Sequence, residues 1–262
     1  MRTAIQVEPR DIAAANRGVD AALIIAVPFY KNERLVDPMV RSLLASAREI
    51  CDLKARVILF DDSPDYPALA DALARAVKTV GDAFPVTVQH NAVNQGWLKT
   101  CNIAMEHANR IGADILLFNS DTIVIPGAIG EMFRVSRLDS MIGFVNPRSN
   151  NATLATLPKI SPSAEDTPIA LAQYRVASRT MPSHSYVPTA VGFAILIRHN
   201  ILSEFGYFDE IYGGGYNEEN DLVMRASRCG YRAALANHAY VWHEGSATLA
   251  ATGDSMQRKE AP

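Results

Sequence analysis

The sequence predicts an α/β protein with a mostly parallel central sheet and helices on both of its faces. Short, continuous apolar runs alternate along the chain with longer segments whose apolar residues recur at helical spacing. Several of the apolar runs end directly in polar residues, which is the pattern expected where buried strands reach the carboxyl edge of a sheet. In open α/β sheets, ligands bind in the crevice beyond this edge.

The first strand is predicted at residues 23–27, a run of apolar side chains that Pro28 ends. An unbroken apolar run is typical of a strand covered on both faces. Residues 33–50 carry apolar side chains at helical spacing and predict the first helix. The same criteria predict further strands at 57–60, 86–89, 115–118 and 142–145, and further helices at 66–80, 97–110 and 127–135. Strands that alternate with helices indicate βαβ units and a parallel sheet.

The alternation stops at residues 146–188, where six prolines and clusters of Ser, Asn and Thr predict a long irregular excursion. Irregular segments of this length usually serve function. Beyond it, the patterns predict strands at 191–197, 233–235 and 240–242 and helices at 200–205 and 220–229. We expect an N-terminal extension at 1–20, one domain over 21–250 with halves at 21–145 and 146–250, and a polar tail at 251–262.

The composition is that of an ordinary globular enzyme, with 48% hydrophobic and 20% charged residues in 262. The 28 acidic and 25 basic side chains give a net charge of −3, which does not favour nucleic acid as a partner. Three widely spaced cysteines form no zinc pattern or disulfide framework, so we expect a cytoplasmic location. The longest strongly apolar stretch, 21–30, is too short to span a bilayer. Peripheral association with the inner face of a membrane stays open.

Two strand ends carry groups that suit a metal ion. The strand at 115–118 runs into Asn119, Ser120 and Asp121, and the strand at 240–242 runs into His243. A carboxylate and an imidazole at two strand ends could hold a divalent cation against a phosphate-bearing substrate. The competing interpretation is that Asp121 caps a turn and that His243 is an ordinary surface histidine.

Acidic residues also gather in the second half. Gly213, Gly214 and Gly215 predict a mobile or closely approached backbone. The carboxylates of Glu218, Glu219 and Asp221 then open a helix, where the helix dipole favours negative charge. Simple capping is the alternative, but a cap needs one acidic group rather than three. Like charges packed together raise the pKa of at least one member, which suits a general base.

Taken in order, these motifs resemble those of family 2 glycosyltransferases, over residues 23–246. The motifs are Val27-Pro28-Phe29-Tyr30, Asp61-Asp62-Ser63, Asn94-Gln95-Gly96 with Asn102, Asn119-Ser120-Asp121, Gly206 to Glu210, Glu218 to Leu222 with Arg225, and Trp242-His243. The resemblance implies the Rossmann-like GT-A fold, a nucleotide-diphosphate-sugar donor, a divalent cation and inversion at the anomeric carbon. The chain departs from the family pattern at Asn119, where Asp is usual, and at Glu219, where Asp is common.

The resemblance also implies residue roles. In the half at 21–145, Pro28 and Tyr30 would pack the base and Asp61 or Asp62 would accept a hydrogen bond from its imide. The other donor-binding positions are Gly96, Asn119, Ser120 and Asp121. Asp121 and His243 would hold Mn²⁺ or Mg²⁺, with the imidazole favouring Mn²⁺. In the half at 146–250, Glu219 would be the general base, with Glu218 as its near substitute. Acceptor contacts and loop closure would involve Gly192, Gly214 and Asp221.

The predicted function is inverting transfer of a sugar from a UDP- or dTDP-sugar to a hydroxyl of a glycan or glycolipid acceptor. A sugar nucleotidyltransferase is the first alternative, although residues 28–32 are not the glycine-rich, basic loop that such enzymes usually carry after the first strand. An inactive nucleotide-sugar-binding module is the second, prompted by Asn119. A plain NAD-binding protein is disfavoured because no Gly-x-Gly-x-x-Gly follows the first strand.

Overall fold

A computed structural model describes residues 22–157, 167–213 and 217–245. The elements in chain order are β1 (Leu23–Phe29), η1 (Glu33–Leu35), α2 (Val36–Ala45), α3 (Ala47–Asp52), β2 (Ala55–Asp61), α4 (Pro67–Val80), β3 (Val86–His90), α5 (Gly96–Ile111), β4 (Asp114–Phe118), β5 (Thr122–Val124), α6 (Ala128–Val135), β6 (Ile142–Arg148), α7 (Thr167–Ser178), β7 (His184–Val187), β8 (Ala194–Ile197), α8 (His199–Phe205), η3 (Glu210–Tyr212), α9 (Glu218–Ser227) and β9 (Arg232–His243).

Within these ranges, nine strands form one sheet in the order β3-β2-β1-β4-β8-β6-β9-β5, with β7 paired to β9. β1, β2, β3 and β4 are parallel to one another. β8 is antiparallel to both β4 and β6, so β6 and its parallel partner β9 run in the direction of β1. Only β5, β7 and β8 run the other way. The predicted α/β fold with a mostly parallel sheet is confirmed.

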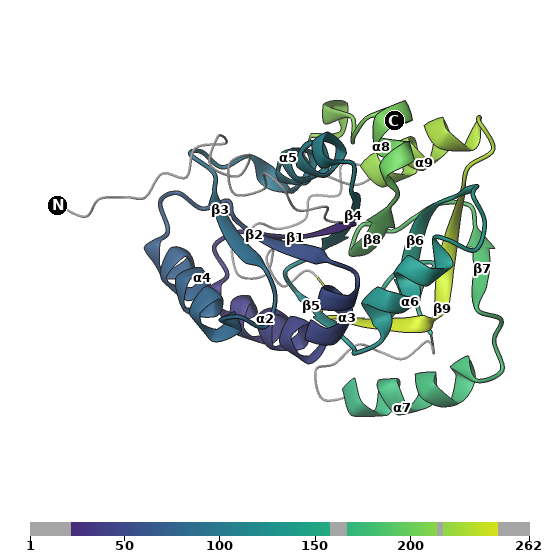
Figure 1. The fold of residues 1–262 in the computed structure, drawn as a ribbon, viewed down its shortest axis with the longest axis horizontal. Helices are drawn as coiled ribbons and strands as arrows, with labels where there is room; N and C mark the ends of the chain where they lie inside the picture. Colours follow the sequence, from purple (N-terminus) through teal and green to yellow (C-terminus); the bar gives the residue numbers. More distant parts are fainter. Residues whose placement is uncertain (1–21, 158–166, 214–216, 246–262) are drawn as a thin grey trace.

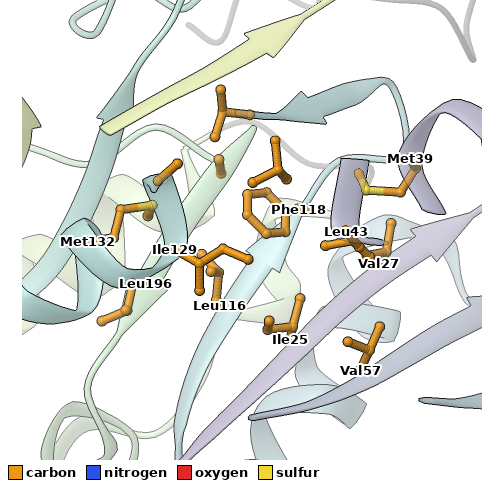
Figure 2. Close-up of a cluster of buried hydrophobic side chains, with 14 of the residues drawn as sticks. Ile25, Val27, Met39, Leu43, Val57, Leu116, Phe118, Ile129, Met132 and Leu196 are labelled. Atoms are coloured by element: carbon orange, nitrogen blue, oxygen red, sulfur yellow. The ribbon is translucent and has the colours of Figure 1, made fainter. Parts of the chain in front are cut away.

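Helices cover both faces of this sheet (Figure 1). Alternate residues of β1 point to opposite faces, so Ile24 and Ala26 pack with α5, α8 and α9. Ile25 and Val27 pack with α2, α4 and α6 on the other face, in the apolar cluster of Figure 2. Because both faces are apolar, the strand reads as a continuous hydrophobic run rather than an alternating one.

Pro28 does not end the first strand, as predicted, but lies inside β1 opposite Phe60 of β2. The last β1 residue paired with β4 is Ala26, so the missing N–H of Pro28 costs no ladder bond on the β4 side. Pro147 lies in β6 in the same way, past the last residue pair with β8 at Val145. The predicted helix 33–50 is also wrong in detail, because it is divided into η1, α2 and α3 with a break at Ser46.

The segment 146–188 is more regular than predicted. β6 continues to Arg148, and α7 and β7 follow. The prolines predicted irregular structure, but Pro168 occupies the first turn of α7, where a helix needs no N–H donor. The predicted strands 233–235 and 240–242 are one strand, β9, and the unpredicted β5 pairs with its carboxyl end.

The proposed boundary between residues 145 and 146 falls inside β6, so both halves share one sheet. The predicted extension 1–20, the tail 251–262 and the predicted hinge residue Gly214 lie outside the described residues. Among the described residues, none of the helices has the length and hydropathy needed to cross a bilayer.

Candidate active site

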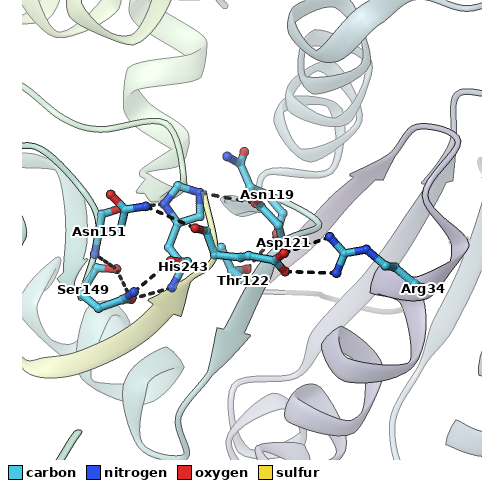
Figure 3. A network of polar contacts seen from close by, with 9 residues as sticks. Arg34, Asn119, Asp121, Thr122, Ser149, Asn151 and His243 are labelled. Carbon is cyan, nitrogen blue, oxygen red and sulfur yellow. Dashed lines mark hydrogen bonds and ion pairs between the residues drawn. The ribbon is translucent and has the colours of Figure 1, made fainter. Parts of the chain in front are cut away.

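The ladder between β5 and β9 brings Asp121 and His243 together. Thr122 pairs with His243, and the N–H of Glu244 donates to the carbonyl oxygen of Asp121 at 3.0 Å. This antiparallel register places the two side chains beside each other although they are more than a hundred positions apart in the chain. The Nε2 atom of His243 lies 3.3 Å from Oδ1 of Asp121. Both side chains are largely buried, and Figure 3 shows them facing each other.

Contacts on the other side of the ring orient His243. Its Nδ1 lies 2.7 Å from the carbonyl oxygen of Asn151, which can only accept a hydrogen bond, so Nδ1 carries the proton. Phe193 stacks on the same ring. Burial works to lower the pKa of His243, but the hydrogen bond and negative charge of Asp121 outweigh it and raise the pKa above its ordinary value. The ring therefore presents Nε2 to the carboxylate.

The residues before Asp121 are fixed by their backbones. The N–H of Asn119 donates to the carbonyl oxygen of Phe193 at 2.8 Å, and the hydroxyl of Thr122 donates to the carbonyl oxygen of Asn119 at 2.8 Å. Ser120 is buried. The side-chain oxygen of Asn119 is buried without a hydrogen-bond partner among the described residues. A buried amide oxygen left unpaired in this way is a site where a ligand can complete the hydrogen bonding.

A pocket of about 270 Å³ lies beyond the carboxyl ends of β1 and β2. Its lining includes two of the residues predicted to bind the donor, Tyr30 and Asp62. The other lining residues are Lys31, Ser63, Pro64, Asp65, Ala92, Val93 and Asn94. Pro28 is buried inside β1 and is not among the pocket-lining residues, whereas Tyr30 is, and the predicted packing of a base by these two residues stays a prediction.

The two neighbouring aspartates have different surroundings. Asp61 is not among the pocket-lining residues, and its Oδ1 accepts from the N–H of Ser63 while Oδ2 lies 2.9 Å from Nδ1 of His90. Asp62 accepts from the side chain of Asn91 and from the N–H groups of Gln95 and Gly96, at 2.7 to 2.8 Å. Burial raises the pKa of Asp62, against the effect of these hydrogen bonds.

The start of α5 therefore already has its anion. The carboxylate of Asp62 accepts from the N–H groups of Gln95 and Gly96, and the positive end of the helix dipole favours a negative charge there. The hydrogen bonds of Asp62 connect the loop at 91–96 to the end of β2, and this loop forms one wall of the pocket.

The acidic motif forms a coupled pair at the start of α9. Glu218 is buried and Glu219 is half-buried, and their side chains share a hydrogen bond. Burial, then the charge of Glu219, raises the pKa of Glu218 to about 7. Burial also raises the pKa of Glu219, but N–H donors, including that of Gly192, and the hydrogen bond from Glu218 oppose the rise. Burial thus raises the pKa of both carboxyls, and their mutual hydrogen bond works to raise the pKa of Glu218 and to lower that of Glu219.

Small and aromatic residues frame this acidic pair. A Cβ added at Gly192 would lie 3.4 Å from the ring of Trp97 and 3.9 Å from Oε1 of Glu219. The Oε2 atoms of Glu218 and Glu219 are buried without a hydrogen-bond partner among the described residues. Asn146, fully buried in β6, fixes the approach to Gly192 through three bonds to the backbone of Val191 and Ala194.

The carboxylate of Asp221 forms an ion pair within its own helix. Its carboxylate pairs with Nε of Arg225 at 2.8 Å, and Arg225 in turn donates to the carbonyl oxygens of Phe205 and Tyr207. Asn102 holds the next part of the same segment by bonding both the N–H and the carbonyl of Phe208. Arg225 and Asn102 thus hold the segment that leads to α9. The predicted acceptor role of Asp221 stays a prediction.

Three residues of the site were missed by sequence reasoning: Asn150, Asn151 and Phe193. The signal for the two asparagines was present, because Ser149-Asn150-Asn151 follows a buried strand directly, like the other motifs. It was overlooked because the strand was predicted to end at Val145. Phe193 has no such signal in the sequence.

The described residues contain no cluster of three or more His, Cys, Asp or Glu side chains able to bind a metal.

Residues 21–260 match the model of the family described as "Glycosyltransferase like family 2". The chain belongs to this family. The match covers nearly the whole length, as the motif resemblance did. No curated protein matches this family 2 chain in sequence.

Solved structures show the same GT-A fold at low sequence identity. GalNAc-T7 with UDP, GalNAc and Mn²⁺ superposes with a TM-score of 0.64 and 14% identity, over 86% of this chain and 44% of that one. The mannosyltransferase PcManGT from Pyrobaculum calidifontis, with GDP-Man and Mn²⁺, gives 0.56 and 14%, over 87% and 58%. S. aureus TarS 1–349 with UDP gives 0.53 and 15%, over 84% and 59%. The family 2 chain thus spans about half the length of these proteins.

Proposed function

We propose that this family 2 chain is an inverting glycosyltransferase that moves a sugar from a UDP- or dTDP-sugar to a hydroxyl of a glycan or glycolipid. The observation that carries the proposal is the contact between Asp121 and His243 at 3.3 Å. Family membership supports the sugar-transfer class, and the pocket at Tyr30 and Asp62 suits a nucleoside. We also keep the cytoplasm as the location, with the acceptor presented at the inner face of a membrane.

The Asp121–His243 pair fits a divalent cation. The donor set is one carboxylate oxygen and one imidazole nitrogen. Because Nδ1–H of His243 is bonded to Asn151, Nε2 beside Asp121 is the ring atom that a cation could take up. Such a mixed set suits Mn²⁺ better than Mg²⁺, which prefers oxygen ligands. The unpaired oxygen of Asn119 is a further acceptor at this strand end. A bound cation would act as a Lewis acid that neutralises charge on the nucleoside diphosphate leaving group.

Glu219 is the proposed general base. Its carboxylate takes the proton of the acceptor hydroxyl while a lone pair of that oxygen forms the new bond to the anomeric carbon. The bond from this carbon to the diphosphate oxygen breaks at the same time, and its electrons leave with the nucleoside diphosphate. The in-line attack inverts the anomeric carbon. The pKa of Glu218, raised to about 7 by burial and by the charge of Glu219, favours a single negative charge on the pair near neutral pH.

Gly192 and Phe193 support the placement of base and cation in one cleft. Gly192 donates its N–H to the carboxylate of Glu219, and its neighbour Phe193 stacks on His243. Two consecutive residues of one segment therefore contact both groups. We propose that this segment holds Glu219 and Asp121 on opposite sides of the reacting sugar, with the acceptor hydroxyl at Glu219 and the donor diphosphate at Asp121.

The test measures release of nucleoside diphosphate from UDP-, dTDP- and GDP-sugars, with Mn²⁺, with Mg²⁺ and with EDTA. We expect Mn²⁺-dependent release from a UDP- or dTDP-sugar and loss of this release in Asp121→Ala and His243→Ala. Polarimetry or NMR of the first-formed product reports the anomeric configuration. Release of pyrophosphate from NTP and a sugar phosphate would instead identify a nucleotidyltransferase. Nucleotide binding without release, with every sugar and acceptor tried, would identify an inactive binding module.

A further inference from the structure

Two asparagines after β6, Asn150 and Asn151, hold the end of β9 on which His243 lies. Figure 3 shows Asn151 beside the ring of His243. The side chain of Asn150 bonds the backbone of His243 on both sides, accepting from its N–H at 2.8 Å and donating to its carbonyl oxygen at 3.0 Å. Asn151 donates from its side chain to the carbonyl oxygen of Glu244 at 3.3 Å. Its own carbonyl oxygen receives Nδ1–H of His243 at 2.7 Å. These contacts fix both the backbone and the ring.

The loop that carries the asparagines is itself well anchored. Ser149 is fully buried, its N–H donates to the carbonyl oxygen of Ala155, and it accepts from the N–H of Leu157 through its own carbonyl oxygen. Thr156 closes the loop through its hydroxyl, which bonds both the N–H and the carbonyl oxygen of Ala152 at 2.9 Å. Asn150 is only 4% exposed. The contacts to His243 therefore come from a part of the chain with little freedom to move.

Gly245 shows how closely this loop covers the end of β9. A Cβ at Gly245 would lie 2.2 Å from Nδ2 of Asn151, and the backbone of Gly245 has a φ of +81°. Both the steric and the conformational requirement favour glycine there. The absence of a side chain at Gly245 therefore leaves the space that Asn151 occupies.

We propose that Asn150 and Asn151 are positioning residues for the metal ligand His243. The inference rests on the proposed function, because it takes His243 as a ligand. A histidine that donates Nδ1–H to a carbonyl oxygen can offer its lone pair only at Nε2, and a fixed backbone aims that atom at Asp121. Neither asparagine contacts the cation, the donor or the acceptor in this role.

A merely structural clamp would stabilise the fold without setting the chemistry of the ring. The two roles differ in their readouts. A positioning role predicts weaker binding of Mn²⁺, and a changed tautomer of His243 as far as the carbonyl of residue 151 moves, whereas a structural role changes only the free energy of unfolding. Partners that orient metal ligands typically contribute about 10- to 100-fold to metal affinity.

The experiment uses the full chain with Asn150→Ala, Asn151→Ala, His243→Ala and, as a matched control, Asn200→Ala. Asn200 lies on α8, where its amide bonds the hydroxyl of Tyr231 at 3.0 Å, and it has no contact with the site. Mn²⁺ affinity in the presence of UDP is measured by the EPR signal of free Mn²⁺. Nitrogen-15 NMR of the histidine rings, in protein without metal, reports which ring nitrogen carries the proton.

We expect Asn150→Ala and Asn151→Ala to weaken Mn²⁺ binding at least about 10-fold, with Asn200→Ala unchanged. The backbone carbonyl of residue 151 is kept in both variants, so we expect the Nε2–H tautomer of His243 to be populated only as far as this carbonyl moves away from Nδ1. Asn151→Ala keeps the deeper bonds of Asn150 and so tests the inference if Asn150→Ala does not fold. Wild-type Mn²⁺ affinity and tautomer in both folded variants, with weak binding in His243→Ala, would overturn this inference alone. Wild-type affinity in His243→Ala would overturn the metal proposal and this inference with it.

Discussion

The ring of Phe193 stacks on the imidazole of His243, with centroids 5.2 Å apart and an interplanar angle of 25°. Phe193 also receives the N–H of Asn119 on its carbonyl oxygen, and its neighbour Gly192 contacts Glu219. The chain entering β8 is therefore the physical link between the metal-competent pair and the acidic pair.

Replacing the proposed base should remove turnover and leave donor binding intact. Glu219→Gln keeps the size of the side chain but cannot accept a proton from the acceptor hydroxyl. We expect kcat to fall about 10²- to 10⁴-fold. The affinity for UDP with Mn²⁺, measured by calorimetry, should stay within about twofold of wild type.

The matched control for this variant is Glu204→Gln, an exposed glutamate of α8 that bonds only the hydroxyl of Tyr231. It should turn over like the wild type. Near-wild-type kcat in Glu219→Gln would remove Glu219 from the role of base. Because burial raises the pKa of Glu219, the wild-type rate should also rise with pH across the range in which this group loses its proton.

Glu218 should make the fold less stable as the pH rises. Its pKa is about 7 in the fold, against an ordinary value of 4.5, so between these values the folded state binds a proton that the unfolded state has lost. The free energy of unfolding therefore falls as pH rises from 4.5 to 7, and the loss persists above 7. Glu218→Gln should remove this loss.

Urea unfolding at pH 5 and pH 8 measures the effect. We expect Glu218→Gln to be more stable than wild type at pH 8 by roughly 1 to 3 kcal/mol, and much closer to it at pH 5. Equal stability differences at the two pH values would show that Glu218 does not hold a proton in the fold. Glu204→Gln serves again as the control and should show no such dependence.

Asp62 should be needed for the structure of the nucleotide pocket. Asp62→Asn replaces an acceptor of three hydrogen bonds by an amide that brings a donor against the N–H groups of Gln95 or Gly96. We expect a loss of about 1 to 3 kcal/mol in the free energy of unfolding, together with weaker UDP binding.

Asp65→Asn is the matched comparison, since Asp65 lines the same pocket but is exposed. Its effect on stability should stay within about 0.5 kcal/mol. If Asp62→Asn unfolds like the wild type, the carboxylate is not what holds the loop at the start of α5.

Gly192 should set the space beside the base. In Gly192→Ala the new methyl group would contact the ring of Trp97 at 3.4 Å and lie 3.9 Å from Oε1 of Glu219, and so fill the space beside the base. We expect kcat or the KM for the acceptor to worsen by about 10-fold, because a displacement of the base by a fraction of an ångström weakens proton transfer. Circular dichroism melting checks that the fold is kept.

Gly130→Ala offers equal crowding away from the site, since its Cβ would lie 3.4 Å from Oε2 of Glu49. This variant should leave kcat and KM unchanged. Wild-type kinetics in Gly192→Ala would mean that the space at Gly192 is not part of the acceptor site.

The order of strands and helices in the first half could be read from the sequence because each element depends on local patterns. Buried strands such as β1 and β4 are unbroken apolar runs, and α4 and α5 carry an apolar face at helical spacing. Strands that depend on a distant partner were harder to read in either half. β5 has three residues and acquires its strand conformation by pairing with β9.

The sequence by itself determined which chemical groups stand at the strand ends, because a polar residue after an apolar run must emerge at the edge of a buried sheet. Only the tertiary structure decided how they combine. It paired Asp121 with His243 through the register of β5 and β9, and it placed the carboxylate of Asp62 at the start of α5. It also brought Asn150 and Asn151 over His243. These contacts join positions far apart in the chain, so no local pattern contains them.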